Sequence, residues 1–272
     1  MKITSLIENT SLRGLPVEHG LSLYIETREG KRILFDMGQS ALFAENALRL
    51  DVSIRDVDVA VVSHGHYDHG GGLQTFLSFN DKAPIYIHQK AFEPHYSLRD
   101  TGLRYIGLDQ DLHENARLVF CHEKTEIDNH MMLFAGVNGD CCRPVGNRLL
   151  FGPAENVNDD FCHEQNLIIQ EDGKTVLLAG CAHNGIVNIL QKATELTGAA
   201  PTHVLAGMHL VKSGLSEADE DKFIARLAAE LMKYNRTQFY TMHCTGEAGY
   251  NKLKAIMGGQ IEYLSCGDKL QL

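Results

Sequence analysis

The fold of this chain is decided by one stretch, Ser63-His64-Gly65-His66-Tyr67-Asp68-His69-Gly70-Gly71-Gly72. Residues 57–62 before it are mostly apolar and rich in β-branched valine, which is typical of a buried strand, and the glycines after it favour a turn into a helix. The imidazoles and the carboxylate therefore stand at the carboxyl end of a strand, where they can point inward together. Neutral imidazole and carboxylate are ligands that suit zinc, iron or manganese. We expect a metal site here rather than a solvated histidine-rich loop.

The rest of the chain alternates strand-like and helix-like segments. Strands are predicted over residues 3–8, 21–27, 32–36, 57–62, 84–88, 131–137, 148–151, 166–170, 175–179, 203–206, 238–242 and 261–264. Helices are predicted over residues 40–50, 73–79, 186–196, 217–234 and 248–257. Strands come first in each half and helices follow them. This order predicts an α/β fold of the four-layer αββα type, with two mixed β-sheets flanked by helices, as one domain over residues 1–272.

Residues 89–130 are the least regular part of the chain. They carry Pro94, Gly102 and scattered charged and aromatic side chains with little periodicity. Long irregular segments in compact domains are often functional covers. We therefore expect an insertion at about residues 89–130 that covers the metal site, with plain surface decoration as the alternative.

Composition narrows the class of protein. Hydrophobic residues make up 44% of the chain, and no apolar run approaches the roughly 20 residues of a membrane helix. The first residues show no signal-peptide pattern, and the odd number of cysteines, seven, does not resemble a disulfide framework, so we expect a cytoplasmic protein. The formal net charge of −10 and the lack of a basic stripe make nucleic acid an improbable partner.

The histidine stretch resembles the His-x-His-x-Asp-His signature of the metallo-β-lactamase superfamily. Four other stretches match that superfamily in order: Ile33-Leu34-Phe35-Asp36-Met37-Gly38, Phe161-Cys162-His163-Glu164, Leu177-Leu178-Ala179-Gly180-Cys181 and Tyr240-Thr241-Met242-His243-Cys244-Thr245-Gly246. The resemblance covers about residues 36–246. It implies an αββα fold and a site for two divalent ions, zinc first, with iron or manganese as alternatives. It also implies that the Asp36 carboxylate orients a ligand histidine.

Carried over by position, the ligands fall into two sets of three: His64, His66 and His163 for one ion, and Asp68, His69 and His243 for the other. The chain departs from the superfamily at Cys181, where most members have an aspartate that bridges both ions. A thiolate is a good zinc ligand, so Cys181 is the first candidate for that position. His183 is the alternative donor, and a third reading leaves neither bound and the second ion weakly held.

A narrower resemblance rests on Glu18-His19-Gly20-Leu21-Ser22-Leu23, Gly180-Cys181-Ala182-His183-Asn184-Gly185-Ile186-Val187-Asn188, Gly207-Met208-His209-Leu210 and His243-Cys244-Thr245-Gly246. These stretches are similar to the metal-dependent hydrolases related to the archaeal 7,8-dihydropterin-6-methyl-4-(β-D-ribofuranosyl)aminobenzene-5′-phosphate synthases. The likeness adds His183 and His209, which each follow a strand-like run and would reach the rim of the site. A histidine bonded only to backbone is the alternative for each, and we expect His19 and His95 to be structural.

The resemblance implies a metal-dependent hydrolase in which a metal-bound hydroxide attacks a phosphorylated or otherwise anionic small molecule. Asp68 would bind metal and orient the nucleophile, and His183 or His209 would protonate the leaving group. A pterin-related synthase is the main alternative. An iron redox protein and a non-catalytic binding module are weaker ones.

Overall fold

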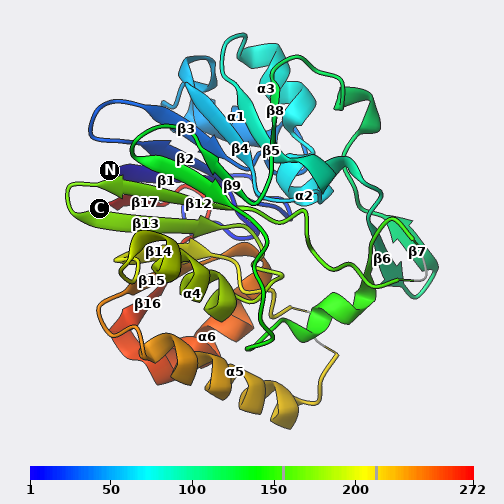
Figure 1. Ribbon diagram of the computed structural model, residues 1–272, viewed down its shortest axis with the longest axis vertical. Helices are drawn as coiled ribbons and strands as arrows, with labels where there is room; N and C mark the ends of the chain where they lie inside the picture. The colour runs from blue at the N-terminus through cyan, green and yellow to red at the C-terminus, as the bar shows by residue number, and fades with distance from the viewer. Residues whose placement is uncertain (155–156, 212–213) are drawn as a thin grey trace.

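The computed structural model describes residues 1–154, 157–211 and 214–272. Within these residues two mixed sheets of seven strands each lie face to face (Figure 1). The first sheet has the order β17-β1-β2-β3-β4-β5-β8, and the second has the order β16-β15-β14-β13-β12-β10-β9. The first sheet comprises β17 (Lys269–Gln271), β1 (Lys2–Ile7), β2 (Ser22–Glu26), β3 (Arg32–Phe35), β4 (Val59–Val62), β5 (Ile85–His88) and β8 (Leu118–Cys121). The second comprises β16 (Ile261–Tyr263), β15 (Gln238–Thr241), β14 (His203–Ala206), β13 (Lys174–Ala179), β12 (Asn166–Glu171), β10 (Met131–Phe134) and β9 (Lys124–Glu126).

Helices cover the outer face of each sheet. The helices are α1 (Leu42–Arg49), α2 (Tyr67–Gly70), α3 (Leu73–Phe79), α4 (Ile186–Thr197), α5 (Glu217–Met232) and α6 (Gly246–Met257). Helices α1 and α3 pack with the first sheet, and α4, α5 and α6 pack with the second. A separate apolar cluster fills the space between the two sheets. Three apolar layers between four structural layers confirm the αββα sandwich.

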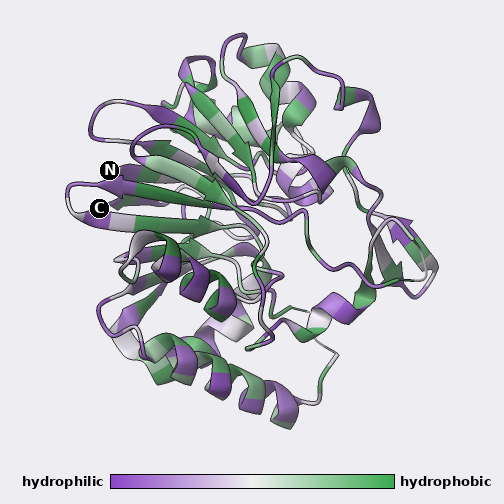
Figure 2. Cartoon of the chain, viewed as in Figure 1, coloured by the Kyte–Doolittle hydropathy of each residue, from purple (hydrophilic) through white to green (hydrophobic). Residues whose placement is uncertain are grey.

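The alternation of side chains along β3 shows how the layers are built. Ile33 and Phe35 are buried between the two sheets, whereas Leu34 is buried toward α1. A strand sends successive side chains to opposite faces, and both faces of this sheet are covered. Continuous apolar runs such as residues 57–62 therefore mark central strands. Figure 2 shows the apolar colouring concentrated on these strands.

Replacing Phe35 by alanine is expected to cost about 3–5 kcal/mol of unfolding free energy, because the cavity would lie between two rigid sheets. The Phe35 side chain is fully buried. Urea denaturation of Phe35→Ala beside Leu98→Ala measures this cost, since Leu98 is 44% exposed and should change stability by only about 0.5 kcal/mol. Equal midpoints for the two variants would contradict the assignment of Phe35 to the central core.

The segment predicted to be irregular over residues 89–130 is partly regular. Strand β8 joins the first sheet beside β5, and β9 joins the second sheet beside β10. Only its middle part stands apart, as a small sheet of β11-β6-β7 built from β6 (Tyr96–Arg99), β7 (Gly102–Tyr105) and β11 (Leu150–Phe151). This small sheet projects from the side of the sandwich in Figure 1. We call β6 and β7 with their turn, residues 96–105, the cover hairpin.

The strand predicted over residues 148–151 is wrong in its first half. Val145–Leu149 forms a 3₁₀ turn, and only Leu150 and Phe151 pair with a strand, which is β6 of the small sheet. The buried Leu150 packs with Ile106 and Phe161 in a small separate cluster and not in a central strand. Among the described residues no helix is long and apolar enough to span a membrane.

Candidate metal centre

The predicted ligand loop follows β4 directly and turns into the one-turn helix α2. Strands β13 and β15 of the second sheet end at the same rim, where Cys181 and His183 follow β13 and His243 follows β15. Gly65 permits this packing, because a Cβ there would overlap the carbonyl oxygen of Ala91. The side chains predicted from distant parts of the sequence therefore meet where the two sheets adjoin.

The first donor cluster consists of His64, His66 and His183, all buried. His64 Nε2 lies 3.1 Å from His66 Nδ1, and the His183 ring lies 5.1 Å from each of the other two rings. The Nδ1 atom of His183 is bonded to Asn147, 2.9 Å away, whereas its Nε2 atom is buried without a partner. A buried nitrogen left unpaired among two other imidazoles fits a metal ligand.

His163, the predicted third ligand of this ion, faces elsewhere. Its Nδ1 accepts a hydrogen bond of 3.0 Å from the Gly65 N–H, and its Nε2 lies 3.2 Å from the Asp159 carboxylate. An imidazole that accepts at Nδ1 carries its proton on Nε2, so neither nitrogen has a lone pair for an ion. His163 nevertheless belongs to a donor group with His66, His95 and Asp159 that could hold an ion, so it stays a candidate ligand beside His183, whose Nε2 is already unpaired.

The second donor cluster consists of Asp68, His69 and His243. The His69 and His243 Nε2 atoms are 3.2 Å apart, and Asp68 Oδ2 lies 4.0 Å and 3.4 Å from them. His19 Nε2 adds a contact of 3.1 Å to the same carboxylate oxygen. These are the three residues predicted for the second ion, and the structure brings them together.

Cys181 lies between the two clusters. Its Sγ is 3.2 Å from His69 Nε2, and it forms donor groups with His64 and His69, with His183 and His209, and with His243 and Cys244. Burial raises the pKa of the Cys181 thiol well above its usual value, so a thiolate needs a nearby cation. This is the central position that a bridging residue would occupy.

Asp36 orients the second cluster, as predicted. Its carboxylate accepts from His69 Nδ1 at 2.7 Å and from the Ser63 N–H and Oγ at 2.7 Å and 2.8 Å. The bond to Asp36 fixes the tautomer of His69 and leaves Nε2 free to face His243 and Cys181. Although burial lowers the pKa of His69, the Asp36 carboxylate outweighs it and raises the pKa overall.

Backbone strain is concentrated at this rim. Asp36, Ala182, His209 and His243 have φ angles of 60°, 54°, 44° and 53°, in the left-handed region. Each such residue costs on the order of 1–3 kcal/mol and persists only when its surroundings hold it. Glu8 supports the last of them by accepting from the His243 N–H at 2.7 Å. These strained backbone conformations indicate that the surrounding structure holds the side chains of this site in fixed positions.

Burial controls protonation in the first cluster. Burial is the largest of the effects on the pKa values of His64, His66 and His183, and it lowers all three well below the usual value. These rings are therefore neutral near pH 7. Neutral imidazole is the form that binds metal. Burial opposes ionisation of Asp68, but hydrogen bonds from His19 and His243 hold the pKa of its carboxyl well below its usual range. Near pH 7 the three histidines are therefore neutral and Asp68 is ionised, which are the protonation states that bind metal ions.

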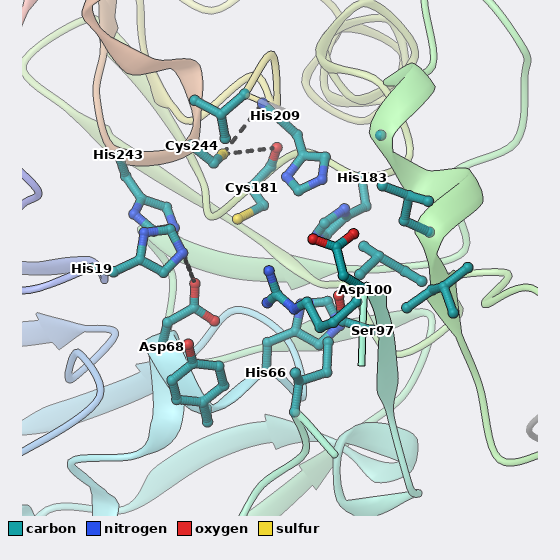
Figure 3. A pocket seen from close by; sticks show the side chains of 18 residues that line it. His19, His66, Asp68, Ser97, Asp100, Cys181, His183, His209, His243 and Cys244 are labelled. Atoms are coloured by element: carbon teal, nitrogen blue, oxygen red, sulfur yellow. Dashed lines mark hydrogen bonds and ion pairs between the residues drawn. The ribbon is translucent and has the colours of Figure 1, made fainter. Parts of the chain in front are cut away.

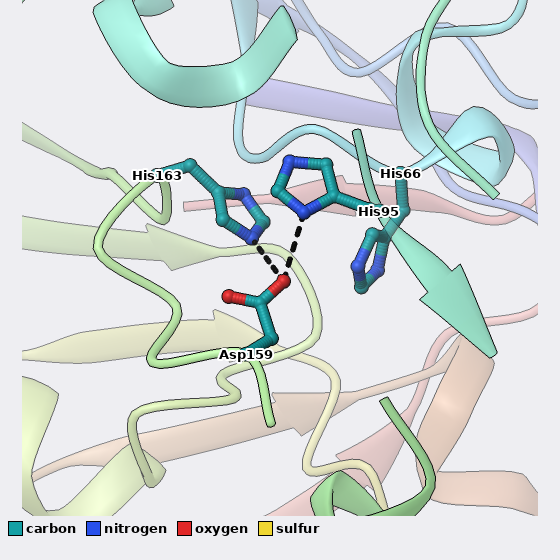
Figure 4. Close-up of side chains that lie close together, drawn as sticks. All are labelled: His66, His95, Asp159 and His163. Carbon is teal, nitrogen blue, oxygen red and sulfur yellow. Dashed lines mark hydrogen bonds and ion pairs between the residues drawn. The ribbon is translucent and has the colours of Figure 1, made fainter. Parts of the chain in front are cut away.

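A buried polar network lies directly behind the first cluster (Figure 4). Asp159 Oδ2 lies 2.8 Å from His95 Nδ1 and 3.2 Å from His163 Nε2, and Asp159 Oδ1 accepts from the Phe161 N–H at 2.7 Å. His66 borders the same network. The fixed tautomer of His163 makes its Nε2–H a donor to Asp159. The network thus holds His163 by hydrogen bonds on both nitrogens.

Asp159→Asn is expected to destabilise the protein by about 1–3 kcal/mol at pH 7, because an amide has one acceptor oxygen and no charge, so it cannot accept both from the Phe161 N–H and from His95 and His163. Burial opposes ionisation of Asp159, but the two histidines hold the pKa of its carboxyl far below its usual range. This stabilisation is therefore complete above the unfolded pKa of about 3.9 and is lost as pH falls below it.

Urea denaturation of chelated protein at pH 7 and pH 3 measures this effect, with Asp100→Asn as the exposed control. The gap between wild type and Asp159→Asn should narrow at the lower pH. A gap of the same size at both values would show that Asp159 is not ionised in the folded state.

A cavity of about 410 Å³ opens over both clusters (Figure 3). Its walls combine donor residues with part of the cover hairpin, namely Ser97, Leu98, Arg99 and Asp100. These four residues belong to the segment predicted to cover the site. His209 also lines the cavity, with its ring 4.4 Å from that of His183 and its Nδ1 buried without a partner.

Sequence reasoning missed three members of this site. His19 and His95 were expected to be structural, yet His19 contacts Asp68 and lines the cavity, and His95 is buried against Asp159. Cys244 was not considered, although its Sγ accepts from the His209 N–H at 3.2 Å. Cys244 could have been predicted to lie at the site, because it directly follows the candidate ligand His243 in the sequence.

Comparison with known proteins identifies the family of this chain. Residues 15–140 match the sequence profile of the metallo-beta-lactamase superfamily. The chain is 32% identical to the uncharacterized protein MJ0448 of Methanocaldococcus jannaschii over 93% of this chain and 94% of that one. It is also 26% identical to the 7,8-dihydropterin-6-methyl-4-(beta-D-ribofuranosyl)-aminobenzene-5'-phosphate synthase of the same organism, over 98% and 95% of the two chains.

Among solved structures, Tm1679, described as a metal-dependent hydrolase of the beta-lactamase superfamily, superposes with a TM-score of 0.82 at 31% identity. The match covers 100% of this chain and 99% of that one. The fold, the ordered donor motifs and these relatives lead to one conclusion: the chain belongs to the metallo-β-lactamase superfamily.

Proposed function

We propose that this protein is a metal-dependent hydrolase that acts on a small anionic molecule with two divalent ions. The observation that carries the proposal is the pair of buried donor clusters, joined by Cys181, at the floor of one cavity. Two adjacent ions would lower the pKa of a bound water and stabilise negative charge that develops on the substrate. Zinc fits the donor set of imidazole, carboxylate and thiolate best, with iron or manganese as alternatives.

The residues divide into three tasks. His64, His66 and His183 would hold one ion, and Asp68, His69 and His243 would hold the other, with Cys181 between them. His209 is the candidate proton donor to the leaving group, because its ring borders the cavity and carries an unpaired buried nitrogen. With His183 assigned as a ligand, the proton-transfer role considered for both histidines falls to His209.

The second candidate is a bond-forming synthase on a pterin-like substrate. It is supported by the 26% identity to the archaeal aminobenzene-phosphate synthase over nearly the full length of both chains. The cavity volume of about 410 Å³ suits a small molecule in either case.

Generic chromogenic substrates test the two candidates against each other. Zinc-, iron- or manganese-loaded protein is mixed with phosphodiester, thioester and lactam chromogens, and metal content is measured in the same samples. Turnover that disappears on chelation supports the hydrolase. Full metal occupancy without turnover of any chromogen would contradict general hydrolytic activity and favour the synthase.

A further inference from the structure

Arg99 lines the cavity but has no role in the metal-dependent reaction proposed above. It ends β6, at the turn of the cover hairpin, and lines the same cavity as His66 and Asp68. Along β6, Ser97 is buried and Leu98 is 44% exposed. Ser97, Leu98, Arg99 and Asp100 all line the cavity, so the turn end of the cover hairpin as a whole forms this part of the wall.

Among residues 1–154, 157–211 and 214–272, none forms a hydrogen bond or an ion pair with the guanidinium of Arg99. Its Nε atom is buried and unpaired, and none of the ion pairs between described residues involves Arg99. Two other partly buried arginines differ: Arg117 donates to Asn80 and Ala83, and Arg143, whose Nε is also unpaired, donates to Asn184 at 2.7 Å through a terminal nitrogen. An unpaired buried donor on a cation is costly, so such a group indicates a partner that comes from outside the chain.

No acid of the cavity serves as that partner. Asp68 is bonded to His19 and lies against His243 and His69. Asp100 lines the cavity from the same turn but is exposed and forms no ion pair with Arg99. Of the described residues around this cavity, Arg99 is the one lysine or arginine. The cavity wall also includes four apolar side chains, those of Ile106, Leu149, Leu150 and Val211.

We propose that Arg99 binds an anionic group of the substrate, a carboxylate or a phosphate, at the hairpin end of the cavity. The inference rests on the proposed function and deepens it, because it separates the anionic group from the bond that reacts over the donor clusters. The substrate class is then a small molecule with an apolar body, a hydrolysable end and an anionic end. Arginine suits this role because its planar fork binds either anion through two charge-assisted hydrogen bonds.

The test uses probes with one or two charged ends on zinc-loaded protein. Methylphosphonate has only the end expected to face the metal ligands, whereas phosphonoacetate, 3-phosphonopropionate and 4-phosphonobutyrate add a carboxylate at increasing distance. Calorimetry should show that at least one two-ended probe binds wild type about tenfold or more tightly than methylphosphonate. Arg99→Gln should abolish this advantage, and Arg99→Lys should keep part of it. A parallel series of alkane diphosphonates shows which of the two anions Arg99 prefers.

Asp100→Asn is the matched control, because it changes a charge in the same turn without removing the guanidinium. It should bind the two-ended probes at least as tightly as wild type. Metal content, measured for every variant, should not change. Equal binding of all probes by wild type and Arg99→Gln would overturn the proposal, as would a wild type that does not distinguish one end from two.

A different experimental result would refute the proposed function without refuting the role of Arg99. Protein that takes up no metal and does not bind methylphosphonate, yet still binds two-ended probes in an Arg99-dependent manner, would refute the metal site and leave the anion site standing.

Discussion

His66→Ala is expected to lose one metal ion and to lower turnover by on the order of 10³-fold or more, while the protein stays folded. The His66 side chain belongs to the first donor cluster, with Nδ1 3.1 Å from His64 Nε2. Residues that act as one unit give nearly the full loss when any one of them is removed. Metal analysis of protein purified without chelators, together with circular dichroism and turnover of whichever chromogen wild type cleaves, measures all three effects.

His88→Ala is the control for removing a buried histidine. His88 lies in β5, outside the two donor clusters, and burial lowers its pKa to about 4. The control should keep both ions. If His66→Ala retained full metal and full turnover, the assignment of the first cluster would be wrong.

His183→Ala and Cys181→Ser are expected to separate the two clusters. His183→Ala should strip the first ion, because it removes one of three donors and leaves an apolar gap. Cys181→Ser should weaken both ions and the second more strongly, because the thiol lies 3.2 Å from His69 Nε2. Cys181→Asp should restore binding, since a carboxylate at this position can bridge two ions. Metal stoichiometry on the three variants measures these differences.

Alkylation gives an independent measure of the thiol. A coordinated thiolate is shielded, so Cys181 should resist iodoacetamide in metal-loaded protein and react after chelation. Mass spectrometry of the modified peptide distinguishes it from Cys244, which is buried beside it. Full metal occupancy in both His183→Ala and Cys181→Ser would eliminate both residues as ligands.

Much of the fold could be predicted because its central strands are apolar on both faces. The runs before His64 and before Cys181 are continuous, and they proved to be β4 and β13. Helix α5 was readable from its start, where the Ser216 hydroxyl accepts from the Asp219 N–H at 3.3 Å. The cover hairpin was not predictable as strands, because it pairs only with residues about 50 positions later, and exposed short strands have weak patterns.

The choice between His163 and His183 shows where sequence reasoning stops. Both histidines stand near the ends of apolar runs, and motif order favoured His163. What separates them is the tautomer that the Gly65 N–H and Asp159 impose on His163, and the unpaired nitrogen that Asn147 leaves on His183. The bonds from Gly65 and Asn147 join residues 98 and 36 positions apart, so no local pattern reveals them, although Asp159 lies only 4 positions before His163.

The two donor clusters draw on both sheets. His64, His66, Asp68 and His69 follow β4 of the first sheet, whereas Cys181, His183 and His243 follow strands of the second. Bound ions would therefore tie the sheets together at one rim, much as a removable cross-link does. Since ions that bind only the folded state stabilise it by mass action, the melting temperature should rise with free metal concentration. On chelation, amide hydrogen exchange should increase first in the loops at this rim, where the sheets would be free to part, before it increases in the apolar layer between them.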